Sequence, residues 1–171
     1  YKYTQGCNID IHIIFIHYII FIHYIMGYKY GIWLVYDQMK FNTNHIGHLT
    51  IACFMTKEDA YKLYDEIIEK CGDTFEVLIY GKSAFYDSAF YENETNKICS
   101  WGYDGTCEYW DTFKHICEKY KCDFAYIPHT SIEYGFNPKI LKQESTHDTI
   151  VKCQVQCVDI RSDFPADWKF I

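Results

Sequence analysis

Apolar and polar positions repeat along this chain with two different periods, and each period predicts one kind of element. Strand-like apolar runs cover residues 29–37 and His48–Met55, with a polar stretch between them. Apolar residues then recur at helical spacing over Lys57–Cys71. Thr56 is the expected N-cap of this helix, and Gly72 is its expected end. The first part of the chain therefore predicts two strands followed by a helix.

The rest of the chain mixes the same two periods. Apolar residues on one face over residues 107–120 predict a second helix. Further apolar runs predict strands over residues 74–80, 83–91 (a strand or a hairpin), 97–103, 123–135 and 150–160. The pair Asp104 and Gly105 predicts a turn that ends the third of these strands. The order β-β-α-β-β, then β-α-β-β, predicts an α+β domain over residues 27–171 with two similar halves.

Residues 1–26 form an apolar, low-complexity segment that differs from this pattern. The unit FIHYI occurs twice within residues 9–26, at 15–19 and 21–25. A membrane anchor would need about 20 apolar residues, and histidines are costly in hydrocarbon. A secretory signal would need a small-residue cleavage site, which does not follow. We favour translated upstream sequence, because the first Met is Met26; an anchor or a true strand remain alternatives.

The charge of the chain limits what it can bind. Lys and Arg number 16 against 23 Asp and Glu, which gives a formal net charge of −7. Long nucleic acids are held by clustered Lys and Arg, so we do not expect that kind of partner. A small nucleotide held by a few fixed groups remains compatible with an acidic chain.

The nine cysteines are irregularly spaced and include no CxxC pair. Structural zinc sites are usually built from such pairs, so we expect no metal ion. His45 and His48 form an H-x-x-H pair, which is an alternative start for a metal site, although no third ligand stands out. We expect reduced cysteines, mostly in the core of an intracellular protein.

Two short motifs carry the candidate chemistry. Residues i and i+2 of a strand share a face, so His48 and Thr50 face one way, as do His129 and Ser131. If the two strands lie together, a common cleft holds two imidazoles and two hydroxyls. One neutral imidazole can take a proton from water, and one protonated imidazole can give a proton to a leaving oxygen. The hydroxyls can donate hydrogen bonds to a phosphate.

The paired H-x-[ST]-x motifs, about 80 residues apart, resemble those of the two-histidine (2H) phosphoesterase superfamily. Pro128 before His129 is similar to the frequent P-H opening of that family. The resemblance implies a bilobal α+β fold, with two pseudo-symmetric lobes of antiparallel sheet and outer helices around a central cleft. It also implies hydrolysis of RNA 2′,3′-cyclic phosphates or of 2′,5′-linked or cyclic nucleotides, without a metal or cofactor. Leu49 follows the family preference for an apolar residue after the histidine, whereas Thr130 departs from it.

From this resemblance we expect a monomeric, cytoplasmic phosphodiesterase whose catalytic residues are His48, Thr50, His129 and Ser131. Its partner would be a small nucleotide or an RNA terminus, with no membrane unless residues 9–26 are genuine. The alternative is a catalytically inactive module of the same fold that binds a nucleotide or an RNA end. The residues do not determine which histidine is the acid and which is the base.

Three further residues are candidates for substrate binding. Lys82 could neutralise a phosphate charge, and Tyr126 and Tyr134 flank the second motif, where they could stack on a base. Ordinary packing is the alternative for both tyrosines, because the chain contains 17 Tyr.

Overall fold

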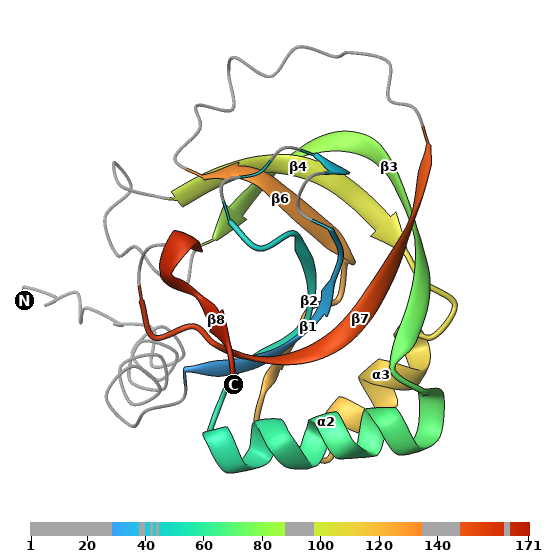
Figure 1. Ribbon diagram of the computed structural model, residues 1–171, viewed down its shortest axis with the longest axis vertical. Helices are drawn as coiled ribbons and strands as arrows, with labels where there is room; N and C mark the ends of the chain where they lie inside the picture. The colour runs from blue at the N-terminus through green and yellow to red at the C-terminus, as the bar shows by residue number, and fades with distance from the viewer. Residues whose placement is uncertain are drawn as a thin grey trace, which may run out of the picture.

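The computed structural model describes residues 29–37, 40, 41, 43, 45–87, 98–134, 148–162 and 165–171 (Figure 1). The interpretations of residues 1–26 lie outside this part of the chain. Within it, no helix is both long enough and apolar enough to cross a membrane.

The described elements are strands and two helices in mixed order, which confirms the α+β class. In chain order they are β1 (Tyr30–Val35), β2 (His48–Met55), α2 (Lys57–Cys71), β3 (Thr74–Asp87), β4 (Ile98–Thr106), α3 (Trp110–Cys117), β5 (Asp123–Phe124), β6 (His129–Tyr134), β7 (Thr149–Asp159), a 3-10 turn (Pro165–Asp167) and β8 (Lys169–Phe170).

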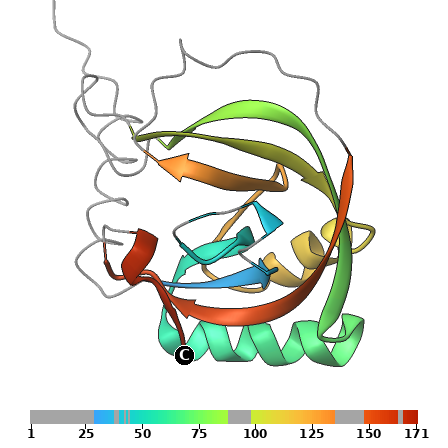
Figure 2. The same ribbon diagram turned by 45° about the horizontal axis from the view of Figure 1, so that its top comes forward.

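The strands form one antiparallel sheet that curls around on itself (Figures 1 and 2). Its order is β5-β2-β1-β7-β3-β4-β6, and β8 pairs with the end of β7, beyond the part that pairs with β3. β7, which comes from the second half of the chain, lies between β1 and β3 of the first half and pairs with both. The expected division into two lobes is therefore not seen in the described residues, where both halves share one sheet.

The apolar core lies on the inner face of this curl. A Cβ built on Gly105 of β4 would stand 2.8 Å from Leu49 Cδ2 of β2, although three strands separate β2 from β4 in the sheet order. Along β7, residues alternate between buried and exposed, as the sequence predicts for a strand with one solvated face. The largest fully buried side chains of the core include Leu34, Leu49, Ile51, Leu63, Ile67, Val77 and Phe113.

Helix α2 begins and ends where the sequence predicts. Thr56 Oγ1 accepts a hydrogen bond from the Asp59 backbone N–H at 3.1 Å, which satisfies a donor that the first turn leaves without a helical partner. Gly72 follows the last residue with a φ of 92°, a conformation that glycine reaches most readily, and its N–H donates to Ile68 O. Helices α2 and α3 contact each other and lie along the lower side of the sheet in Figure 1.

Three predicted boundaries are wrong, and backbone pairing explains two of them. Residues 74–80 and 83–91 were expected as separate strands, but Gly81, with a φ of 60°, sits in a bulge that lets β3 continue to Asp87. The turn expected at Asp104 and Gly105 is instead the paired interior of β4, opposite Tyr80 and Ile79. The second helix covers only Trp110–Cys117 of the expected 107–120.

The predicted strand over residues 123–135 is divided into β5 and β6, which lie on opposite edges of the sheet. Ala125 N–H donates to Ile51 O of β2 at 2.9 Å, whereas Pro128 O accepts from Gly105 N–H of β4 at 2.8 Å. The chain therefore crosses from one edge to the other within residues 125–128. As a result β2 and β6, the two strands that begin with the motif histidines, contact each other directly.

Candidate functional site

The first motif lies at the start of β2, on the face opposite the core. His48 and Thr50 share that face, while Leu49 points into the core. His48 is only 5% exposed. Its ring stacks on Trp33 with a centroid distance of 3.6 Å and an interplanar angle of 10°, and Trp168 meets it edge-on at 5.9 Å. Two indole rings therefore fix the orientation of the His48 imidazole.

The second motif begins β6 and divides between the two faces of the sheet in the same way. His129 and Ser131 share one face, with His129 partly exposed and Ser131 8% exposed. Thr130 faces the core, where it is 1% exposed and its hydroxyl is 2.6 Å from the Tyr36 hydroxyl. This hydrogen bond explains how β6 accommodates a polar residue where the 2H resemblance implies an apolar one.

Both motif histidines make the same local hydrogen bond. His48 Nδ1–H donates to Ile46 O at 2.6 Å, and His129 Nδ1–H donates to Ile127 O at 2.9 Å. A carbonyl oxygen can only accept, so each neutral ring carries its proton on Nδ1 and its lone pair on Nε2. The two imidazoles are thus held in the same tautomer by the residue two positions before them.

A third histidine joins the two motif strands. His45 lies just before β2, is buried, and its Nε2–H donates to Ser131 O of β6 at 3.2 Å. The centroid of its ring is 6.2 Å from that of His48. The sequence marks His45 only as a possible metal ligand; its long-range bond to β6 has no signal in the local pattern.

Burial controls the electrostatics of this group. It is the main cause that lowers the pKa of His48 to about 3; the bond to Ile46 O opposes this shift, and positive charge on His45 and His129 adds to it. Burial also lowers the pKa of His45. His48 is therefore neutral at physiological pH in the absence of a bound anion. His48 and His129 begin β2 and β6, which contact each other.

Comparisons with protein-family models, curated proteins and solved structures found no match to this chain. The assignment of a function consequently depends on the geometry of the site and on the motifs.

No three His, Cys, Asp or Glu side chains within the described ranges are grouped so as to hold a metal ion. His45 and His48 thus lack a third ligand in this part of the chain, and His45 binds a backbone carbonyl instead. The seven cysteines whose side chains are described are all free thiols.

The three predicted substrate-binding residues lie on different elements of the chain. Lys82 lies in β3 and Tyr134 ends β6, but their side chains are outside the described part of the molecule. Tyr126 lies on the link between β5 and β6 and is 75% exposed. Its ring meets that of Phe124 edge-on at 5.6 Å, and Lys114 Nζ lies 5.7 Å from its centroid. The ring of Tyr126 is therefore accessible to solvent, and it also packs at the surface against Phe124 and Lys114.

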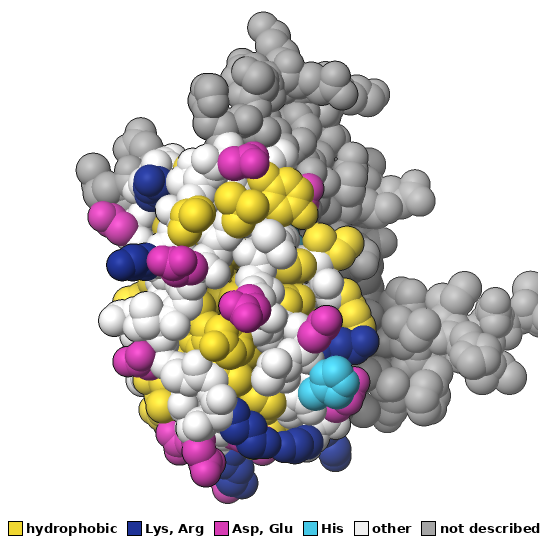
Figure 3. Space-filling model, turned by 90° about the vertical axis from the view of Figure 1, so that its right-hand side faces the viewer, with side chains coloured by type: hydrophobic (Ala, Val, Ile, Leu, Met, Phe, Trp, Pro, Cys, Tyr) yellow, Lys and Arg dark blue, Asp and Glu magenta, His cyan; other side chains and the backbone are white. Residues whose placement is uncertain are grey.

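The described surface carries charged side chains of both signs. On the face shown in Figure 3, Asp and Glu side chains are scattered among apolar and uncharged groups. Several Lys and Arg side chains gather at the lower edge of this face. Two hollows of the described surface, one beside Tyr36 and Lys152 and one beside Cys122, include neither motif histidine.

Replacing Tyr36 with Phe is expected to destabilise the protein by about 1–3 kcal/mol, because the buried Thr130 hydroxyl loses this partner. Adding Thr130→Val, which removes the second hydroxyl at similar volume, is expected to restore part of that loss. Urea unfolding of Tyr36→Phe, Thr130→Val and the double variant measures the coupling free energy between the two hydroxyls. Losses that simply add would show that the 2.6 Å contact between the Tyr36 and Thr130 hydroxyls does not stabilise the protein.

Proposed function

We propose that this protein is a metal-independent phosphodiesterase that cleaves a 2′,3′-cyclic phosphate or a 2′,5′-linked or cyclic nucleotide, with His48 and His129 as acid and base. One observation carries the proposal: two histidines, each followed by a hydroxyl on the same strand face, share one tautomer on two strands that touch. Two Nε2 lone pairs fixed in this way suit proton transfer on either side of one phosphorus atom.

The environments of the two rings favour different roles. His48 is buried and neutral, which suits a base that takes a proton from the attacking water. A phosphate anion beside it would raise its pKa, since an opposite charge favours the protonated ring. The stacked Trp33 and the bond to Ile46 O both stabilise the imidazolium that forms. His129 is partly open to water, so its protonated form is solvated and can donate to the leaving oxygen.

The two hydroxyls complete the proposed site. Thr50 lies two residues after His48 and Ser131 two residues after His129, each on the face of its histidine. Both can donate to non-bridging phosphate oxygens, where negative charge develops in the transition state. His45 acts here as a positioning residue, because its bond to Ser131 O holds β6 against the segment before β2.

The proposal also includes an approximate symmetry between the two halves of the chain. Each motif strand lies at or next to an edge of the sheet, β6 at one end and β2 beside the two-residue β5 at the other. We propose that the two halves of the chain are related by an approximate symmetry, with the contact between β2 and β6 at its centre. Tyr126, beside His129 in the chain, would offer a ring for a base to stack on, with Tyr134 and Lys82 as further contacts.

The wild-type protein is expected to cleave at least one member of a panel of 2′,3′-cyclic, 3′,5′-cyclic and 2′,5′-linked nucleotides in buffer that contains EDTA. Ion-exchange chromatography of the products measures the cleavage, and heat-denatured protein is the control. Complete lack of turnover across the panel, at high protein concentration, would overturn the proposed activity.

The same panel tests the competing proposal, a module that binds a nucleotide or RNA end without cleaving it. The burial of His48 between Trp33 and Trp168 favours that alternative, because a ligand must displace part of this packing to reach Nε2. A binding module would be stabilised against heat by one nucleotide with no product formed.

A further inference from the structure

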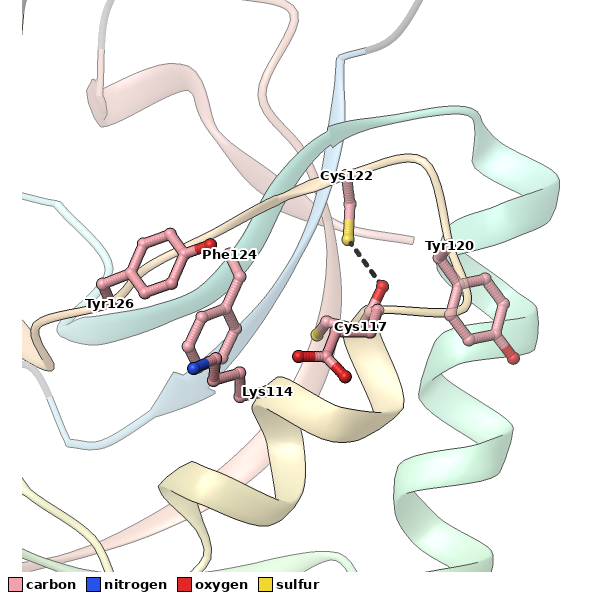
Figure 4. A pocket seen from close by; sticks show the side chains of 7 residues that line it. Lys114, Cys117, Tyr120, Cys122, Phe124 and Tyr126 are labelled. Carbon is pink, nitrogen blue, oxygen red and sulfur yellow. Dashed lines mark hydrogen bonds between the residues drawn. The ribbon is translucent and has the colours of Figure 1, made fainter.

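The end of α3 brings two cysteines together, and this pair does not depend on the proposed phosphodiesterase site. Cys117 is the last residue of the helix. Its carbonyl oxygen accepts from Tyr120 N–H at 2.9 Å, and Tyr120 O accepts from Cys122 N–H at 3.1 Å, so the chain folds back tightly. Cys122 Sγ thereby comes within 3.7 Å of Cys117 O, as the dashed line in Figure 4 shows.

A small hollow of about 120 Å³ opens beside the pair. Lys114, Tyr120 and Phe124 contribute to its lining together with both cysteines (Figure 4). Cys122 is partly exposed, whereas Cys117 is only 3% exposed. A small reagent can therefore reach the Cys122 thiol from solvent, whereas the Cys117 thiol is buried.

The two thiols also differ in acidity. The Cys117 thiol stabilises a Cys122 thiolate by hydrogen bonding and so lowers the pKa of Cys122, although burial and the nearby carboxylates Asp123 and Asp59 oppose this shift. The same interaction, with burial, raises the pKa of Cys117. Thiolate is the nucleophilic form of cysteine, so the exposed partner is also the more reactive one.

We propose that Cys122 is a modification site for small hydroperoxides, with Cys117 as the thiol that resolves the product. The Cys122 thiolate attacks the terminal peroxide oxygen, the O–O bond breaks, and the leaving alkoxide or hydroxide takes a proton. Cys117 then attacks the sulfenic sulfur, an S–S bond forms, the S–O bond breaks, and the oxygen leaves as water. Two thiols and one hydroperoxide give one disulfide, one alcohol (water, for hydrogen peroxide) and one water, which balances the two electrons transferred.

The position of the pair gives this oxidation a structural consequence. Asp123 and Phe124 of β5 follow Cys122 directly and pair with Cys53 and Ala52 of β2. A Cys117–Cys122 disulfide would tie the end of α3 to the strand that starts the crossing between the two sheet edges.

Treatment of the full chain with hydrogen peroxide is expected to yield a peptide in which Cys117 and Cys122 are linked, detected by mass spectrometry after alkylation of the remaining thiols. In Cys117→Ser, which cannot form the bond, Cys122 is expected to be trapped by dimedone as a sulfenic acid. In Cys122→Ser, Cys117 is expected to stay reduced, because it is buried and less acidic.

Cys71 is the matched control, since its thiol is also partly exposed but burial raises its pKa. We expect Cys122 to react with iodoacetamide about tenfold faster than Cys71 at neutral pH. Equal rates at the two thiols, or peroxide oxidation that leaves Cys117 and Cys122 unlinked in the wild type, would overturn the proposal.

Discussion

His129→Ala is expected to lower kcat/KM for the cleaved nucleotide by about 10²–10⁴, the usual contribution of general acid–base catalysis. Of the two proposed catalytic histidines, His129 is the easier to replace without a change in folding, because its ring is partly exposed and its removal leaves no buried cavity. The proposed role is proton donation to the leaving oxygen, so the loss should appear in kcat more than in KM. Steady-state assays with EDTA present, beside a thermal melt, measure both activity and folding.

His115→Ala is the matched control for this substitution. His115 is exposed on α3 and its Nδ1–H donates to Asp111 O at 2.6 Å, which is the same kind of bond that His129 makes. This variant should retain wild-type activity. His48→Gln should lose as much activity as His129→Ala, with some loss of stability, because the stacking on Trp33 is removed. A folded His129→Ala protein with unchanged kcat would exclude His129 as the acid.

Gly102→Ala is expected to destabilise the protein by about 3 kcal/mol or more, near or beyond the upper range for overpacking in a core. A Cβ on Gly102 would stand 1.8 Å from the Thr130 backbone oxygen, and backbone atoms cannot rotate out of the way as a side chain can. β4 and β6 must therefore separate at the register position that pairs Gly102 with Ser131. We expect a fall in melting temperature of about 6–12 °C, together with lost activity, since His129 and Ser131 move with β6.

Gly81→Asn is the comparison for Gly102→Ala. Gly81 lies in the same sheet with a φ of 60°, which Asn adopts more readily than most residues, and the nearest atom to its built Cβ is 3.5 Å away. This variant should melt closer to the wild type. If Gly102→Ala is as stable as Gly81→Asn, the close approach of β4 and β6 is not a constraint on the fold.

The elements that sequence predicts well are those whose signals are local. The cap by Thr56, the end at Gly72 and the alternation along β7 each depend on neighbouring residues, and all three are observed. The two motifs were also predicted from local alternation, and the structure places His48 and His129 on strands that touch.

The features that sequence reasoning missed depend on partners far along the chain. Asp104 and Gly105 have the composition of a turn, but Gly105 lies against Leu49 because the sheet curls, and no local pattern encodes the curl. The polar Thr130 counts against the second motif in the sequence, yet Tyr36, from the other half of the chain, satisfies its hydroxyl. His45 reaches Ser131 in the same way.

The short link over residues 125–128 limits which changes of sequence the fold can tolerate. Its two ends are bonded to Ile51 O and Gly105 N–H, so an inserted residue would shift one sheet edge against the other and misalign the imidazoles. Tyr126 and Ile127 within it project into solvent. Exchange of these two side chains leaves the backbone bonds intact, so the surface of the link can change while its length stays fixed.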